Sequence, residues 1–237
     1  MSIFLKANWE NIVMANYEIP EEILLKYLPK GVTIDLYKGK AYISLVGFLF
    51  KNTKIFNVPM YKLGTFEEIN LRFYVSRKVG NEIRRGVVFI NETVPYKAVA
   101  WLANALYKEH YTTIPTRHKW SFTDKQKEIK YEWLVNKKWN SIELFASKDQ
   151  KKMEKNSFES FIFEHYYGYT KYNDTITEEY QIAHPSWLVN EIETYKIDCD
   201  FENMYGKDFA VLDKTEPSSI FLAEGSAITI NWKRNKI

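Results

Sequence analysis

The run Glu68–Val75 constrains the fold most, because its alternating residues give a β-strand two different faces. Successive side chains of a strand point to opposite sides of the sheet. One face carries Ile69, Leu71, Phe73 and Val75, and the other carries Glu68, Asn70, Arg72 and Tyr74. The segment Val79-Gly80-Asn81-Glu82 then has the composition of a tight turn, and a second strand returns through Glu92. We therefore predict an antiparallel hairpin.

The returning strand indicates where the polar face points. With Gly80-Asn81 as a two-residue turn, the predicted register pairs Tyr74 with Val87, Arg72 with Phe89, and Asn70 with Asn91. A face in contact with water would rarely surround an arginine with valine and phenylalanine. The opposite face, where Val88 and Ile90 lie beside Phe73 and Leu71, has the composition of a core. We therefore expect both faces of the hairpin to be covered.

An interior position for the polar row has an energetic consequence. A buried charge without a partner costs several kcal/mol, so these side chains must be paired or hydrogen-bonded. Glu68 and Arg72 are about 13 Å apart along the strand, so we do not expect their side chains to touch directly. Two interpretations follow and stay open: the row lines a cavity and brackets a ligand, or it forms a filled structural network.

The rest of the chain predicts short strands with a few helices between them. Helices are expected from Pro20, over residues 98–107 and over residues 157–163. Hairpins are expected for 32–37 with 41–50, 129–135 with 139–146, and 165–169 with 176–182, and a closing strand for 226–232. An aromatic share of 16% also favours strands. These patterns predict an α+β fold, a curved antiparallel sheet or barrel in a single domain over residues 1–237.

Charge and cysteine content narrow the classes of partner. The net charge of +3 is too small, and the basic residues are too scattered, to indicate nucleic-acid binding. The single cysteine, Cys199, permits no intramolecular disulfide, which fits a reducing compartment. No stretch approaches the roughly 18 apolar residues of a membrane span. We expect a cytoplasmic protein that is not associated with membranes.

Two histidines form a second candidate site. Glu164 and His165 precede one predicted strand, and His184 follows the next, so strand pairing can bring them close. Histidine transfers protons near neutral pH, and these side chains can border the same cavity as Glu68. The alternative is that His165 is a hydrogen-bonded sheet residue and His184-Pro185 ends a strand. No close His or Cys spacing favours zinc, so we predict no metal site and no cofactor.

The chain resembles a known family. The segments that carry the resemblance are FLKANWENIVMANYEIPEEILLKYLPKGVTIDLYKGKAYISLVGF, FEEINLRFYV, RGVVFINETVPYKAVAWLANALY, FIFEHYYGYT and IAHPSWLVNEIE. They are similar to the YqjF-like bacterial proteins of unknown function, which belong to the acetoacetate decarboxylase-like superfamily. The resemblance implies a curved antiparallel cone or barrel around a small cavity. It also makes Glu68 the counterpart of that superfamily's cavity glutamate.

The sequence departs from that superfamily at its reactive lysine. The decarboxylase forms a Schiff base through a lysine whose pKa is lowered by an adjacent cation. Aligned by resemblance, Tyr111-Thr112 stands where the lysine pair is expected. Lys108 has Glu109 beside it, which would raise its pKa, and Lys97 is exposed by helical spacing. We therefore predict that this chain does not perform Schiff-base decarboxylation.

Three functional hypotheses follow from these residues. In the first, an enzyme uses Glu68, Arg72 and His165 to bind and protonate a small carboxylate- or carbonyl-bearing molecule, with Asn70, Tyr74, Glu164 and His184 contacting the ligand. In the second, the same cavity holds a small organic, anionic ligand without catalysis. In the third, the polar row is purely structural. Exposed sheet edges are compatible with a homodimer, and no residue pattern identifies an interface.

Overall fold

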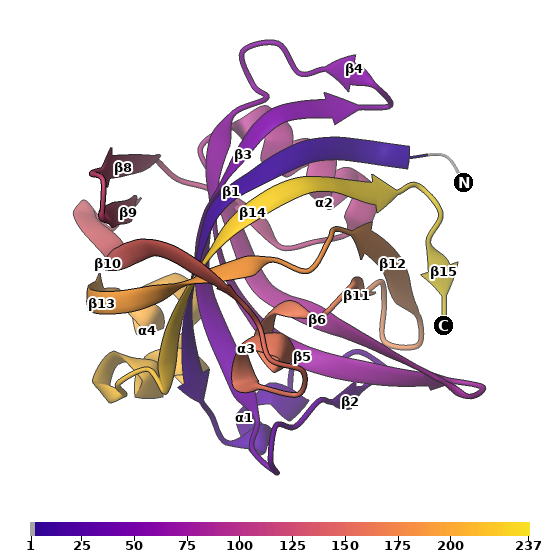
Figure 1. Cartoon of the computed structure of the whole chain (residues 1–237). Helices are drawn as coiled ribbons and strands as arrows, with labels where there is room; N and C mark the ends of the chain where they lie inside the picture. Colours follow the sequence, from indigo (N-terminus) through magenta and orange to yellow (C-terminus); the bar gives the residue numbers. More distant parts are fainter. Residues whose placement is uncertain (1–2) are drawn as a thin grey trace.

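A computed structural model describes residues 3–237 and shows long strands that curve into a ring (Figure 1). In the ring, each strand pairs with the next in the order β12-β11-β6-β5-β3-β1-β14, and a short β12–β14 pairing closes it. All these pairings are antiparallel except the two-residue pairing of β11 with β6. The strands are β1 (Ile3–Glu18), β3 (Tyr42–Ile55), β5 (Phe66–Val79), β6 (Glu82–Val94), β11 (Tyr167–Lys171), β12 (Thr177–Ala183) and β14 (Ser219–Asn231).

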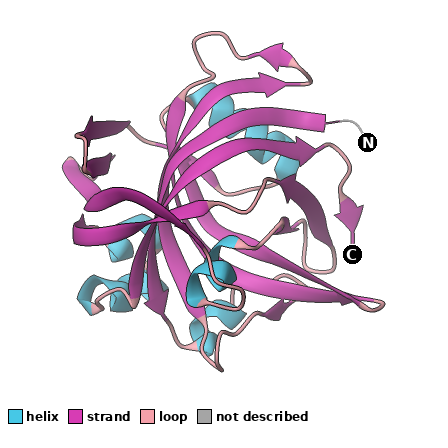
Figure 2. Cartoon of the chain, in the orientation of Figure 1, coloured by secondary structure: helices cyan, strands magenta, loops and turns pink. Residues whose placement is uncertain are grey.

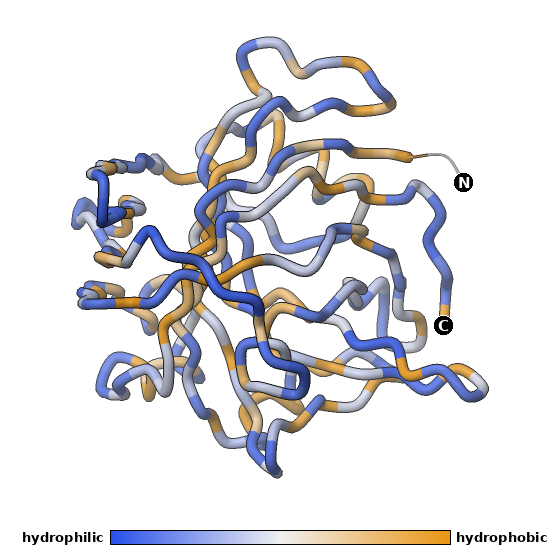
Figure 3. Tube along the Cα trace, viewed as in Figure 1, coloured by the Kyte–Doolittle hydropathy of each residue, from blue (hydrophilic) through white to orange (hydrophobic). Residues whose placement is uncertain are grey.

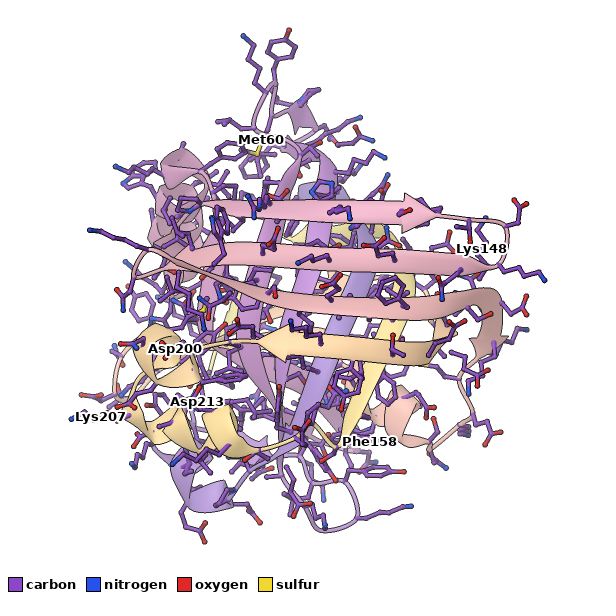
Figure 4. All side chains as sticks on the ribbon, turned by 90° about the vertical axis from the view of Figure 1, so that its left-hand side faces the viewer. Met60, Lys148, Phe158, Asp200, Lys207 and Asp213 are labelled. Atoms are coloured by element: carbon purple, nitrogen blue, oxygen red, sulfur yellow. The ribbon has the colours of Figure 1, made fainter. Side chains whose placement is uncertain are left out.

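A second layer continues from β14 and covers one side of the ring. Its strands follow the order β13-β10-β9-β8 and run across the ring strands behind them (Figure 4). They are β8 (Thr116–Phe122), β9 (Gln126–Val135), β10 (Lys138–Lys152) and β13 (Leu188–Asp198). Lys148, a residue of β10, lies at one end of this layer, and Asp200 and Asp213 mark the helical segments below it (Figure 4).

The helices are short and lie around the sheet rather than within it (Figure 2). They are α1 (Glu21–Leu25), α2 (Lys97–Tyr107), α3 (Phe158–Phe163), α4 (Phe201–Tyr205) and the 3-10 helix η1 (Lys207–Lys214). Short strands complete the fold: β2 (Thr33–Ile34), β4 (Val58–Pro59), β7 (Tyr111–Thr113) and β15 (Asn235–Lys236). Within residues 3–237, none of the helices has the length and apolar character needed to cross a membrane.

Two apolar cores lie on opposite faces of the long ring strands. The first fills the space between the ring and the second layer and includes Leu71 and Phe73 of β5 with Trp133 of β9. The second lies inside the ring and includes Phe66 and Tyr74 of the same strand. Apolar segments gather in the middle of the molecule, and the tip of the β5–β6 hairpin is largely hydrophilic (Figure 3). The prediction that both faces of β5 are covered is therefore confirmed.

The predicted fold is confirmed in its main features, namely a large curved, mainly antiparallel sheet with few short helices. The β5–β6 hairpin turns at Gly80-Asn81, and Tyr74 pairs with Val87 and Arg72 with Phe89, as expected.

The predicted hairpin of residues 32–37 with 41–50 is wrong. The segment β2 pairs with Val75 and Ser76 of β5 instead. Only an isolated bridge joins Tyr37 to Lys40. β3 already has β1 and β5 on its two sides, so no edge of β3 remains for β2.

Candidate active site

One end of the ring encloses a cavity of about 90 Å³. A buried water needs about 10–15 Å³ of such free volume, so this space suits several waters or a small organic molecule. Most of the wall is apolar and includes Trp9, Phe50 and Phe66. The polar part of the wall is formed by Thr53, Glu68, Asn70, Arg72, Glu92, Glu109, Tyr111 and Tyr180. The cavity therefore combines an apolar lining with one concentrated polar side.

Strand β5 supplies the first polar residues of the wall. Its inward-facing side chains are Phe66, Glu68, Asn70 and Arg72, which alternate with side chains in the core between the layers. Phe66 stacks on Phe50 with ring centroids 4.8 Å apart and forms the apolar end of this row. The row thus changes from aromatic to ionisable along a single strand.

A β-bulge in the hairpin brings Glu92 to the polar side. The register of β5 with β6 shifts between Leu71 and Arg72. After the shift, Asn70 pairs with Glu92 rather than with Asn91 as the sequence predicted. A bulge adds one residue to one strand and so exchanges the faces of everything beyond it. The glutamate therefore faces the cavity, whereas the Asn91 amide hydrogen-bonds the carbonyl of His110.

The segment that follows α2 supplies Glu109 and Tyr111. Lys108 follows the last residue of α2 as its C-cap and has a left-handed backbone with φ of 54°. The chain then pairs with β6 as β7, and Asn104 holds Tyr111 through both its main-chain N–H and its carbonyl, at 2.8 and 2.9 Å. Glu109 is buried and Tyr111 is half-buried, whereas His110 between them is exposed. Extended backbone thus directs two alternate side chains inward.

Hydrogen bonds hold the two ends of this row of polar side chains. Glu68 accepts a hydrogen bond from the Asn70 amide at 3.0 Å and another from the Tyr111 hydroxyl at 3.0 Å. Glu92 lines the same wall, and among residues 3–237 its buried Oε2 has no hydrogen-bond partner. Thr170 and Tyr180 hold Glu109 at the other end of the row, because their hydroxyls donate to Glu109 Oε1 at 2.7 Å each.

Burial shifts the pKa of all three glutamates upward. It raises the pKa of Glu68 to about 7, against the lowering effect of the Asn70 and Tyr111 hydrogen bonds. It raises the pKa of Glu109 to about 7 as well, and raises that of Glu92 well above its ordinary value, with Glu109 and Glu68 adding repulsion. Carboxylates that share a dry site cannot all ionise together. Near neutral pH the cavity therefore holds exchangeable protons.

Arg72 lies in this cavity without an acidic partner. Within residues 3–237, no carboxylate forms an ion pair with its guanidinium at 4.0 Å or less. Its contacts include the Met14 sulfur at 3.7 Å and the Tyr74 ring, whose centroid is 6.0 Å from the guanidinium carbon. Its Nε is buried and has no hydrogen-bond partner among the residues that the structure describes. The guanidinium therefore has donors available to a ligand.

Comparison with known proteins identifies the family. Residues 6–227 match the DUF2071 family, described as an uncharacterized conserved protein. The chain belongs to this family. The uncharacterized protein YqjF of Bacillus subtilis strain 168 is 23% identical over 198 residues, which cover 80% of this chain and 76% of that protein. The predicted YqjF-like family is thereby confirmed.

Solved structures with the same fold come from acetoacetate decarboxylase-like proteins. An acetoacetate decarboxylase-like enzyme from Sphingomonas wittichii RW1 has a TM-score of 0.66 and 9% identity over 100% of this chain and 94% of its own. The enduracididine biosynthesis enzyme MppR in complex with pyruvate has a TM-score of 0.63 and 8% identity over 100% of this chain and 91% of its own. At such low identity the likeness shows the fold alone, and this fold is the predicted one.

The other residues predicted from β5 and the histidines lie off the cavity wall. The Tyr74 hydroxyl is buried and hydrogen-bonds Ser44 Oγ at 2.6 Å. His165 packs against the Tyr74 ring with centroids 4.8 Å apart and contacts Asp35 at 3.2 Å through Nε2. Burial lowers the pKa of His165 to about 4, so this imidazole is neutral at physiological pH. Both residues belong to a packed network beside the cavity.

Glu164 and His184 form a separate cluster nearer the surface. The Glu164 carboxylate accepts hydrogen bonds from the hydroxyls of Tyr166 and Ser186, the latter at 2.7 Å. His184 stacks on Trp187 with centroids 4.0 Å apart and planes 13° from parallel. The DUF2071 chain thus brings Glu68, Asn70 and Arg72 together in one cavity but places Glu164, His165 and His184 elsewhere.

The described wall of the cavity contains no lysine. Lys97 and Lys108, at the two ends of α2, are both exposed. Tyr111, which the resemblance aligned with the reactive position, instead donates a hydrogen bond to Glu68. No group of three or more His, Cys, Asp or Glu side chains over residues 3–237 is arranged to hold a metal ion.

Proposed function

We propose that the cavity binds a small carboxylate- or carbonyl-bearing molecule and that Arg72 holds the anionic group of this ligand. The observation that carries the proposal is a guanidinium without a carboxylate partner, on a cavity wall that also presents three glutamates. A partly buried cation without a counter-ion is costly to maintain for stability alone. A carboxylate can accept two parallel hydrogen bonds from an arginine, which fixes its orientation.

Glu68 is the proposed proton donor or acceptor for this ligand. Its pKa of about 7 means that both protonation states are populated near neutral pH, as general acid–base catalysis requires. The Asn70 and Tyr111 hydrogen bonds hold the two carboxyl oxygens in place. Protonated Glu68 can donate to a ligand carbonyl, and the carboxylate can remove a proton from the adjacent carbon. Neither step requires a covalent adduct with lysine.

The choice of ligand class is supported by MppR, a protein of this fold whose structure was solved in complex with pyruvate. Pyruvate carries both a carboxylate and a carbonyl, and it has the size expected for a cavity of about 90 Å³. Pyruvate and acetoacetate are therefore the first probes for the DUF2071 chain.

The binding test compares thermal unfolding with and without each probe. At a probe concentration 100 times Kd, binding stabilises the folded protein by about 2.7 kcal/mol, which for a chain of this size raises Tm by roughly 5–10 °C. We expect this shift in wild type and in the control Arg117→Gln, whose arginine is exposed and paired with Glu132. Arg72→Gln should lose it. An equal shift in Arg72→Gln would refute the proposed anion site.

Turnover separates an enzyme from a binder. In D₂O, proton abstraction by Glu68 would replace the methyl protons of bound pyruvate with deuterium, which proton NMR detects. We expect exchange in wild type and loss of exchange, with binding retained, in Glu68→Gln. Binding without exchange or any other turnover in wild type would assign the cavity to a non-catalytic binder. A lysine adduct trapped by borohydride would contradict the proposed lysine-free chemistry.

A further inference from the structure

Glu109 borders two hollows in the molecule. One is the cavity inside the ring, and the other is a surface cleft of about 260 Å³ on the outside of the same wall. The cleft lies between the end of α1 and the strands β6 and β11, with Lys26, His110 and Lys171 on its rim. The side chain of Glu109 is buried, so it forms part of the partition between the two spaces.

The ring is thin at this place because two of its strands separate. β6 and β11 pair only where Gly86 and Val87 meet Tyr167 and Gly168. Beyond this point Thr170 of β11 no longer pairs with β6 and instead donates its hydroxyl to Glu109 Oε1 at 2.7 Å. A carboxyl group therefore stands where a complete sheet would place main-chain hydrogen bonds.

The row of polar side chains in the cavity ends at this partition. The Tyr111 hydroxyl donates to Glu68, and Glu92 lines the same wall close enough to Tyr111 and Glu109 for these groups to influence one another's pKa. Among residues 3–237, Glu92 Oε2 is buried and has no hydrogen-bond partner, so this oxygen is available to take up a proton from Glu109 and pass it on. Each of these groups can both accept and release a proton, which is what a proton relay requires.

We propose that Glu109 relays protons between solvent in the cleft and Glu68 in the cavity, through Glu92 and Tyr111. This proposal deepens the proposed function and rests on it. When Glu68 gives a proton to the ligand, it takes one from Tyr111, which takes one from Glu92, which takes one from Glu109. Glu109 takes its proton from water in the cleft. One proton moves from solvent to ligand, and every side chain returns to its starting state.

The relay has a functional reason. A bound ligand fills the cavity and excludes the water that would otherwise reprotonate Glu68. A second route through the wall lets Glu68 exchange its proton while the ligand remains in place. The charged and titratable groups that face Glu109 are Glu92 from β6, Glu178 and Tyr180 from β12, and Lys26, His110 and Lys171 around the cleft.

The test measures how fast the buried carboxyl protons exchange with D₂O while pyruvate fills the cavity. Infrared spectroscopy follows the protonated carboxyl band of Glu92, which Glu92→Gln identifies. We expect Glu109→Gln to slow its exchange by about tenfold or more, because an amide cannot pass a proton along. Thr170→Val removes one hydrogen bond but keeps the carboxyl, so its exchange should stay close to wild type. Glu67→Gln, which alters a glutamate bonded to Thr116 and His118, serves as the matched control.

Two results would overturn the relay. The first is equal exchange in wild type and folded Glu109→Gln, which would mean that protons enter through the cavity itself. The second is equal slowing in Glu109→Gln and Thr170→Val, which would indicate a structural effect. If Glu109→Gln does not fold, Glu109→Asp takes its place, with slowed exchange expected and wild-type exchange contradicting the relay. If wild type shows no rise of Tm with pyruvate, the proposed function fails; if wild type and Glu109→Gln both bind pyruvate and exchange equally fast, the relay alone fails.

Discussion

Replacing Glu68 with glutamine should stabilise the protein at high pH. Glutamine keeps the shape of the side chain but cannot ionise. Its carbonyl oxygen can accept the Tyr111 hydrogen bond, and its NH2 group can donate to Asn70 Oδ1 once the Asn70 amide flips, since this oxygen has no partner among residues 3–237. The pKa of Glu68 rises from an ordinary value of 4.5 to about 7 in the folded protein. At about 1.4 kcal/mol per pKa unit, this shift corresponds to about 3 kcal/mol of folding free energy.

The sign follows from which state holds the proton. Between pH 4.5 and about 7, the unfolded chain loses the Glu68 proton while the folded protein keeps it. The free energy of unfolding therefore falls through this window and stays low above it. Glu68→Gln lacks this loss, so its stability relative to wild type should increase by about 3 kcal/mol from about pH 4 to about pH 8.

Urea unfolding of both proteins across this pH range measures the difference. The difference matters more than either curve, because His165 acts in the opposite direction. Its lowered pKa of about 4 costs stability as pH falls from 6.5, equally in both proteins. Glu67→Gln is the control with the opposite sign, since its His118 and Thr116 hydrogen bonds lower the pKa of Glu67. An advantage of Glu68→Gln that is constant or shrinks with rising pH would refute a buried, protonated Glu68.

Three further outcomes test other parts of the structure. Glu179→Gln leaves Arg77 and Arg84 without their buried carboxylate, so urea unfolding should show a loss of about 3–5 kcal/mol. In Gly168→Ala, a Cβ would lie 2.1 Å from the ring of Tyr180, so this ring must move and Tm should fall, whereas an unchanged Tm would contradict the packing. Across unbranched carboxylates from formate to hexanoate, calorimetry should show affinity rising by about 0.8 kcal/mol per methylene until the chain outgrows the cavity. Affinity that does not depend on chain length would place the ligand outside this lining.

Alternation along β5 predicted both of its faces, because each face packs against a complete layer. The turn at Gly80-Asn81 also predicted the register as far as Arg72. The bulge between Arg72 and Leu71 has no clear sequence signal. Because its one extra residue changes which side chains of β6 face the cavity, the sequence did not predict Glu92 as a cavity residue. Glu109 was not predicted as a cavity residue for another reason. It lies after a helix in a short extended segment, where only Glu109 and Tyr111 point inward, and two positions are too few to reveal an alternating pattern.

The long N-terminal strand β1 was not predicted, although it pairs with both β3 and β14. Its alternation changes phase near Asn11, which has a left-handed backbone with φ of 50° where the register with β3 shifts. Because the alternation of inward and outward residues shifts by one position at the bulge, the whole segment does not follow one continuous two-residue pattern. The hairpin error at residues 32–37 has a similar origin, since the partner of β2 was decided by tertiary packing.

The composition of the cavity suits the chemistry proposed here, which uses no lysine. A reactive lysine must lose its proton, which a dry apolar wall and a neighbouring cation promote. The same dry wall has the opposite effect on a glutamate, because it favours the protonated acid. The described cavity wall presents three glutamates and Tyr111 but no lysine, so its apolar lining acts on acids rather than on an amine. Such a site lacks an amine to capture a carbonyl covalently, but it can bind an anion at Arg72 and move protons beside it.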